Sequence, residues 1–134
     1  MQTPGRPAVA AVILAALAVQ IPAAAHHSFA ADYDVTRPVT LKGTVVRAEW
    51  TNPHVHFFLT VGDGPGAAEW ELEMGAVNGL FRRGWTRAML APGDVVTVEG
   101  YLARERAHMA NARVITLRDG RKMSGGTVPD AQAK

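Results

Sequence analysis

The sequence predicts a mainly β domain of five short strands, with one short helix between the third and fourth strands. Runs rich in β-branched and aromatic residues recur from Val39 to Leu117, and turn signals built from Gly, Pro, Asn and Asp separate them. A helix signal stands between the third and fourth runs. Together these observations indicate a single domain built around a sheet.

The first two predicted strands are Val39–Trp50 and His54–Val61, and Thr-Asn-Pro at residues 51–53 turns the chain between them. Gly43 interrupts the β-branched run of the first strand, which predicts a bulge or a bend at that position. A Gly-rich loop over residues 62–66 follows the second strand.

The third predicted strand, Glu69–Met74, alternates strictly between polar and apolar residues. One face carries Trp70, Leu72 and Met74, and the other carries Glu69, Glu71 and Glu73. This period of two is typical of a half-buried strand. Three carboxylates in a row repel one another, so we expect Arg or Lys on a neighbouring strand rather than a bound hard cation.

Asn78 is a candidate cap for a short helix that runs to about Arg83, and Gly84 ends it. Thr86 is a candidate cap for a further turn through Leu90. The composition of this stretch predicts the helix between strands three and four.

The last two predicted strands are Val95–Ala103 and Asn111–Leu117. Gly100 sits where a strongly coiled strand of a small barrel has to bend. Five strands with a helix between the third and fourth is the order of a small OB-like barrel. We therefore expect an OB-like β domain over 39–123, an extended N-terminal arm over 26–38 and a disordered tail over 124–134.

Residues 1–25 have the pattern of a cleavable secretory signal. Arg6 lies in a short n-region, an apolar run follows from Ala8 to Ile21, and small residues occupy positions 23–25. The favoured cut is before His26, with a cut after Ala24 as the alternative. The apolar run of 14 residues is shorter than the ~20 that span a bilayer. We therefore expect a periplasmic or secreted protein without stable membrane insertion, and a permanent anchor is the less favoured alternative.

The predicted mature chain keeps 109 of the 134 residues, enough for one domain with a modest core. It contains no Cys, which excludes disulfides, c-type haem attachment, thiolate metal sites and a lipoprotein anchor. Residues 26–75 hold three basic and seven acidic residues, whereas residues 76–134 hold ten basic and five acidic ones. The two halves can face each other in the fold. Export makes nucleic acid an improbable partner for the basic half.

The predicted N-terminus offers copper a site. Cleavage before His26 frees an amine that can chelate together with the imidazole of the same residue, and one more imidazole completes a planar nitrogen set that suits Cu(II). Cleavage after Ala24 instead places His27 third in the chain, where the amine, two backbone amides and the imidazole can surround Cu(II). The alternative is an ordinary polar terminus that binds copper adventitiously.

His54 and His56 form a second candidate site. Residues two apart on a strand project from the same face, so both imidazoles can share one ion. His26 or His27 supplies a third ligand if the arm folds back onto them. The alternative is a solvent-facing pair. His108 and Met109, before the last strand, are a weaker candidate for a soft Cu(I) ligand set.

A possible partner surface lies around the predicted helix, where Trp85 stands among Arg82, Arg83 and Arg87. Arg near a helix C-terminus is stabilised by the helix dipole, which accounts for the cluster without any function. The functional alternative is a surface for an anion or a polysaccharide, with Trp85 as a stacking platform.

Six short motifs follow one another along the mature chain: His26-His27-Ser28-Phe29-Ala30, Asp32-Tyr33-Asp34, Gly43-Thr44-Val45, Glu49-Trp50-Thr51-Asn52-Pro53-His54, Arg83-Gly84-Trp85-Thr86-Arg87 and Pro92-Gly93-Asp94. In this order they resemble one family of exported bacterial proteins, the domain of unknown function numbered 6152. The resemblance covers nearly all of the mature chain and implies export and a single small β domain. The family's His-His start and Asn-Pro-His segment coincide with the two His sites above. Ala76-Val77 stands where the resemblance leads us to expect a Ser-Pro-like entry into the helix.

The sequence contains no catalytic motif, so we expect a binding protein rather than an enzyme. The leading hypothesis is a periplasmic protein that binds or handles copper or another divalent metal, with His26, His27, His54 and His56 as ligands. The second hypothesis is a non-metal OB-like module for a glycan, a peptide or a partner protein. A copper site that activates oxygen is a third and less favoured option.

Overall fold

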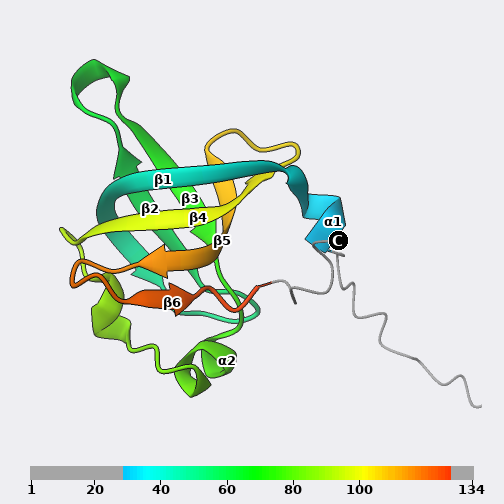
Figure 1. The fold of residues 1–134 in the computed structure, drawn as a ribbon, viewed down its shortest axis with the longest axis vertical. Helices are drawn as coiled ribbons and strands as arrows, with labels where there is room; N and C mark the ends of the chain where they lie inside the picture. Colours follow the sequence, from blue (N-terminus) through cyan, green and yellow to red (C-terminus); the bar gives the residue numbers. More distant parts are fainter. Residues whose placement is uncertain (1–28, 128–134) are drawn as a thin grey trace, which may run out of the picture.

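The computed structural model describes residues 29–127. It is mainly β, as the sequence predicts, with six strands in one sheet in the order β3-β2-β1-β4-β5-β6 and two short α-helices (Figure 1). The predicted signal over 1–25, together with His26 and His27, lies outside the described residues.

The strands are of very unequal length. They are β1 (Tyr33–Glu49), β2 (His56–Val61), β3 (Ala68–Glu73), β4 (Val95–Ala103), β5 (Met109–Thr116) and β6 (Lys122–Ser124). The helices are α1 (Phe29–Asp32) and α2 (Val77–Arg82), with single 3-10 turns η1 (Gly64–Gly66) and η2 (Arg87–Leu90). None of the helices within 29–127 is long and apolar enough to cross a bilayer.

Neighbouring strands in this order pair antiparallel, and one further pairing is parallel. It joins β3 to β5, with Glu71 opposite Met109 and Glu73 opposite Asn111. Each of the strands β1 to β5 therefore has a paired strand on both sides, while β6 pairs with β5 alone. The parallel contact places the acidic face of β3 beside the loop that precedes β5.

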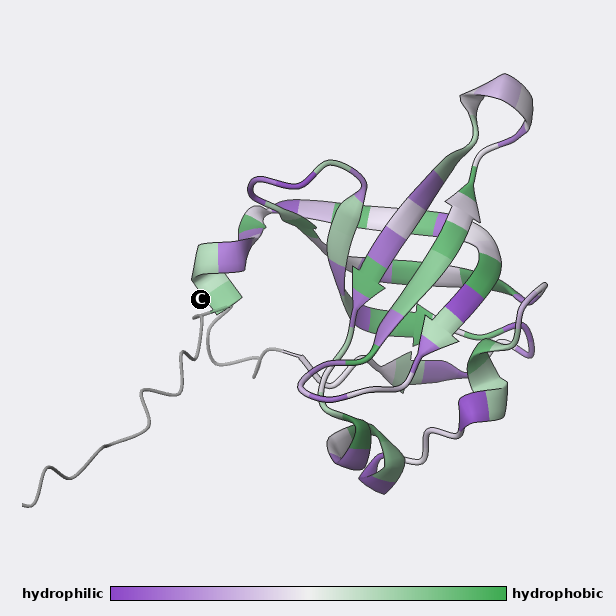
Figure 2. Ribbon diagram, turned by 180° about the vertical axis from the view of Figure 1, so that it is seen from behind, coloured by the Kyte–Doolittle hydropathy of each residue, from purple (hydrophilic) through white to green (hydrophobic). Residues whose placement is uncertain are grey.

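Hydrophobic and hydrophilic residues alternate along much of the sheet (Figure 2), and buried residues alternate with more exposed ones along most of β2 and β4. α2 adds its buried residues Val77 and Leu80 to the core, and Trp85 and Leu90 follow from the segment after it. The strand residues of this core are Leu41, Val45, Phe57, Leu59, Leu72, Val96, Val98, Ala110, Ala112 and Ile115.

Two glycines allow the curvature of the long strands. β1 is strongly curved (Figure 1), and within it Gly43 pairs with Val61 of β2 and with Val96 of β4. A Cβ at this position would lie 2.5 Å from the carbonyl oxygen of Thr60. At Gly100, a Cβ would collide with the carbonyl oxygen of Asn111. The register between β4 and β5 shifts between Glu99 and Gly100, with the extra residue, Arg113, on β5, whereas the irregularity of β1 lies just after Gly43, between Val45 and Arg47.

The structure differs from the sequence-based expectation at both ends. The segment 29–38, expected as an extended arm, is the helix α1 followed by the start of β1. The ring centroids of Phe29 and Tyr33 are 5.2 Å apart, and both residues pack in a small apolar cluster with Ala103 and Met109. At the other end, Lys122–Ser124 form a sixth strand on β5 that was not expected, and only its last residue, Ser124, belongs to the predicted tail. Neither segment has the β-branched run that identifies the other strands.

The helix between β3 and β4 begins earlier than expected. α2 starts at Val77, its N-cap is Ala76, and no side chain caps it, so the predicted cap by Asn78 is wrong. Gly84 follows the helix with a φ of 91°, as expected for a residue that ends a helix. Thr86 is the N-cap of η2, but its hydroxyl makes no capping hydrogen bond.

Candidate functional site

The start of β2 and the turn before it carry the two predicted metal-binding histidines, His56 and His54. His54 and His56 flank Val55, which is fully buried, so the two imidazoles lie on the face opposite the core. The side chain of His54 is 49% exposed and that of His56 is 26% exposed. The structure thus places both imidazoles on one accessible face of the sheet.

Each imidazole touches a carboxylate of β3 through the same ring nitrogen. Nδ1 of His54 lies 3.1 Å from Oε1 of Glu73, and Nδ1 of His56 lies 2.9 Å from Oε1 of Glu71. Both are close contacts without the direction of a hydrogen bond, and Nδ1 of His56 is buried. Because Nδ1 of each ring faces a carboxylate, Nε2 is the nitrogen available to a ligand.

Two of the three carboxylates of β3 form ion pairs with Arg residues from two other segments. Glu69 pairs with Arg47 of β1 at 3.0 Å, and Glu71 pairs with Arg106 of the β4–β5 loop at 2.5 Å. Two of the three carboxylates therefore have a basic partner, but not from a neighbouring strand as expected. Arg47 lies on β1, which pairs with β2 rather than with β3, and Arg106 lies in the loop before β5.

The third carboxylate accepts a hydrogen bond from a phenol. The hydroxyl of Tyr33 donates to Oε2 of Glu73 over 2.8 Å, and the Tyr33 side chain is 2% exposed. Burial raises the pKa of Tyr33 far above its usual range, and the charge of Glu73 raises it further. The phenol is therefore a fixed donor, and Glu73 connects it to His54.

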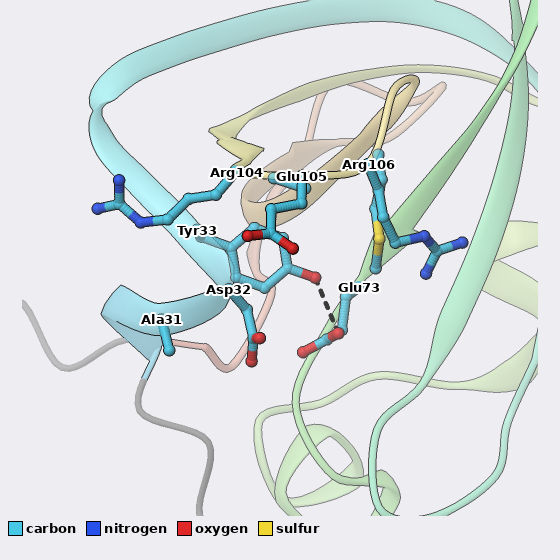
Figure 3. A pocket seen from close by; sticks show the side chains of 9 residues that line it. Ala31, Asp32, Tyr33, Glu73, Arg104, Glu105 and Arg106 are labelled. Atoms are coloured by element: carbon cyan, nitrogen blue, oxygen red, sulfur yellow. Dashed lines mark hydrogen bonds between the residues drawn. The ribbon is translucent and has the colours of Figure 1, made fainter.

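A cavity of about 310 Å³ opens beside this connection. The hydroxyl of Tyr33 points to Glu73, and the Glu105 side chain lies beside the Tyr33 ring, while the side chains of Arg104 and Arg106 extend away to opposite sides (Figure 3). Ala31 and Asp32 of α1 also line the cavity. Glu73 consequently has one carboxyl oxygen directed at the cavity wall and the other at His54.

Residues 29–127 contain no complete metal site. No group of three or more His, Cys, Asp or Glu side chains within this part of the chain is arranged to hold a metal ion. His108 is separate from the pair, because its ring packs on Trp70 with centroids 5.2 Å apart. Met109 is buried and 7% exposed. His26 and His27 lie outside the described residues, so their predicted role stays a prediction.

The predicted partner surface is only partly as expected. Trp85 is 2% exposed, and its indole Nε1 donates to the carbonyl oxygen of Ser124 over 2.8 Å. It therefore cannot be the stacking platform, because it fixes β6 to the core. Arg82, Arg83 and Arg87 are exposed, as predicted.

Sequence reasoning did not find Tyr33, Glu73 and Arg106 as parts of the site. From the sequence, Glu73 is only one of three carboxylates on a strand face, and Tyr33 is part of an extended N-terminal arm. The alternation of β3 indicates which residues share a face. It does not indicate which distant segments reach that face, and the β3–β5 pairing decides this.

Comparison with known proteins gives one family. A family model described as a family of unknown function, DUF6152, matches residues 13–112. The chain belongs to the DUF6152 family. The match confirms the resemblance seen in the motifs, and the described site residues Tyr33, His54, His56, Glu73 and Arg106 all lie within the matched part of this DUF6152 chain. A search of the curated proteins found no match.

Proposed function

We propose that this protein binds a metal ion through Nε2 of His54 and His56. The observation that supports the proposal is that each imidazole has its Nδ1 beside a carboxylate of β3, at 3.1 Å and 2.9 Å. Histidines that bind metals commonly donate the other ring nitrogen to a carboxylate, which fixes the tautomer and makes the ligating nitrogen more basic. Two such histidines side by side are half of a four-coordinate site.

The remaining ligands are assigned to the processed N-terminus. His26 brings its amine and its imidazole, and His27 is a further donor. His26 is three residues before Phe29, where α1 begins, so the intervening chain spans at most about 10 Å. α1 leads directly into Tyr33, which is hydrogen-bonded to the same Glu73 that contacts His54.

Copper is the ion that this donor set suits best. The set consists of imidazole nitrogens and an amine, and the sequence contains no Cys. Cu(II) prefers nitrogen donors in a planar arrangement and is favoured over other divalent first-row ions in such sites. The protein accordingly buffers or delivers copper in the periplasm or outside the cell, after removal of residues 1–25.

The scaffold of this site is an OB-like barrel in our proposal. The pairings run from β1 to β2, β3, β5, β4 and back to β1, and α2 lies between β3 and β4. This is the strand order expected of an OB-like barrel. The site then lies on the outer face of β2 and β3, near the end of the barrel that α1 approaches.

The test is a Cu(II) titration of protein exported and processed by a bacterial host, with the N-terminus checked by mass. We expect one equivalent bound with a nitrogen environment in the EPR spectrum, and a loss of affinity of about 100-fold or more in His54→Ala and His56→Ala. His108→Asn is the matched control, because His108 packs on Trp70 and has a positive φ that Asn tolerates.

Weak binding that survives both substitutions contradicts the proposal. Such a result would mean that the N-terminus binds copper adventitiously. The second hypothesis, a module for a glycan, a peptide or a partner protein, would then replace the metal-binding proposal.

A further inference from the structure

We infer that the surface formed by α2, η2 and Trp50 docks on an anionic phospholipid surface. The inference is independent of the metal site. It starts from the charges that the fold leaves without partners.

Most basic side chains of the described chain are paired with carboxylates within 4.0 Å. Arg47, Arg104, Arg106, Arg113, Arg118, Arg121 and Lys122 all have such partners. Within residues 29–127, five basic side chains have no such partner. Arg37 and Lys42 stand apart on β1, whereas Arg82, Arg83 and Arg87 follow one another closely on α2, directly after it and on η2, and all three are exposed. Arg83 instead donates one hydrogen bond to the carbonyl oxygen of Gly79, one turn earlier on α2. Three uncompensated positive charges therefore stand within six residues of one another.

An aromatic pair lies among these charges. Trp50, at the end of β1, stacks on Phe81 of α2 with ring centroids 5.6 Å apart and an interplanar angle of 24°. Phe81 is 39% exposed, which makes it one of the few large apolar side chains in the described chain that face solvent. The guanidinium of Arg87 lies over the same ring, 5.7 Å from its centroid.

This combination favours a lipid surface over a sugar or an acidic peptide. Trp50 and Arg87 already occupy ring-face area of Phe81, so little face is left for a sugar to stack on. α2 lies at the outer edge of the molecule (Figure 1). Exposed aromatic rings flanked by Arg suit the headgroup region of a bilayer, where the rings enter the acyl boundary and the guanidinium groups meet phosphates.

The expected docking is peripheral and weak, because the aromatic area is small and three basic residues supply the attraction. Each basic residue near an anionic leaflet adds to the affinity, and salt screens this attraction. We therefore expect binding to vesicles that contain phosphatidylglycerol, no binding to vesicles of phosphatidylcholine alone, and weaker binding as ionic strength rises.

The experiment is sedimentation of the exported, processed protein with both kinds of vesicle. The combined variant Arg82→Gln, Arg83→Gln and Arg87→Gln should lower the partition coefficient by about ten-fold or more. The control variant Arg47→Gln, Arg104→Gln and Arg113→Gln removes the same charge from paired positions outside α2 and η2, so its binding should stay close to that of the wild type. Thermal melts establish that both variants fold.

Three results would overturn the inference. They are equal binding to neutral vesicles, equal losses in both variants, and binding to polyglutamate without binding to vesicles. The last result would assign the surface to an acidic protein partner. The salt dependence of the wild-type protein is measured without any variant, so the test does not depend on the folding of the substituted chains.

Discussion

The hydroxyl of Tyr33 donates a hydrogen bond to Oε2 of Glu73 over 2.8 Å, across 40 residues of sequence. The other oxygen of the same carboxylate lies 3.1 Å from Nδ1 of His54. One carboxylate of β3 thus joins the first residue of β1 to the turn before β2. This arrangement fixes the imidazole of His54 and ties the start of the described chain to the candidate metal site.

Replacing Glu73 by Gln should weaken metal binding without abolishing it. The substitution keeps the size of the side chain but removes the charge that faces Nδ1 of His54. Loss of such a carboxylate lowers metal affinity by about 10- to 100-fold. Calorimetric titration with Cu(II) measures the effect. Glu69→Gln is the control, because Glu69 pairs with Arg47 and contacts neither histidine. The copper affinity of this variant should match that of the wild type.

The stability of the fold should fall at high pH because of Tyr33. An unfolded tyrosine loses its proton near pH 10, whereas burial and Glu73 raise the pKa of Tyr33 in the folded chain. Above pH 10 the folded state therefore holds a proton that the unfolded state has released. The free energy of unfolding then falls by about 1.4 kcal/mol per pH unit from this group.

Tyr33→Phe isolates this contribution. The variant should lose about 1 kcal/mol at pH 7 with the hydrogen bond to Glu73, and its stability should fall less steeply between pH 10 and 11. Urea unfolding at a series of pH values measures both effects. Identical slopes for the two proteins in that interval would show that Tyr33 is not held protonated.

Gly100→Ala should destabilise the domain strongly. A Cβ at Gly100 would collide with the backbone carbonyl of Asn111 on β5, and a backbone atom cannot turn away as a side chain can. We expect a loss of about 3 kcal/mol, the upper part of the range for overpacked sites. Gly66→Ala is the matched control, since no atom lies within 4 Å of a Cβ there. Denaturant midpoints of the two variants test this prediction, and equal midpoints for Gly100→Ala and Gly66→Ala would contradict it.

Trp85→Ala should lower stability far more than Trp50→Ala. Trp85 is buried and bonded to Ser124, so its removal leaves a cavity and frees β6. The expected loss is about 3–5 kcal/mol. Hydrogen exchange of the β6 amides should become faster at the same time. Trp50 is only partly buried, and a loss as large as that of Trp85 would contradict the assigned packing.

The strand positions could be predicted from the sequence, because alternation and turn residues are local signals. β3 is the clearest case: Leu72 and Met74 are fully buried, as its period of two predicts. α1, the early start of β1 at Tyr33 and the short β6 were not predicted, since contacts with distant residues stabilise them. Tyr33, for example, is opposite Ala103 of β4.

The candidate site could be predicted only in part, for the same reason. The spacing of His54 and His56 indicates that they share a face, and the structure places them so. The contacts with Glu71 and Glu73 depend on the register between β2 and β3. His56 is opposite Glu73 in this register, and each imidazole contacts the carboxylate diagonally across from it, so that His56 meets Glu71 and His54 meets Glu73. Register depends on pairings that no single segment of the sequence determines. Trp85 was misassigned because an apolar ring among three Arg residues has the same sequence pattern whether it is buried or exposed.

The most direct test of the proposed site is long-range ¹H–¹⁵N NMR of the imidazoles during titration of the processed protein with Zn(II), a diamagnetic probe. We predict that His54 and His56 carry their proton on Nδ1 before the titration. On metal binding, the Nε2 resonances of both should shift, while His108 stays unchanged. Shifts confined to the N-terminal imidazoles, or none at all, would contradict the account.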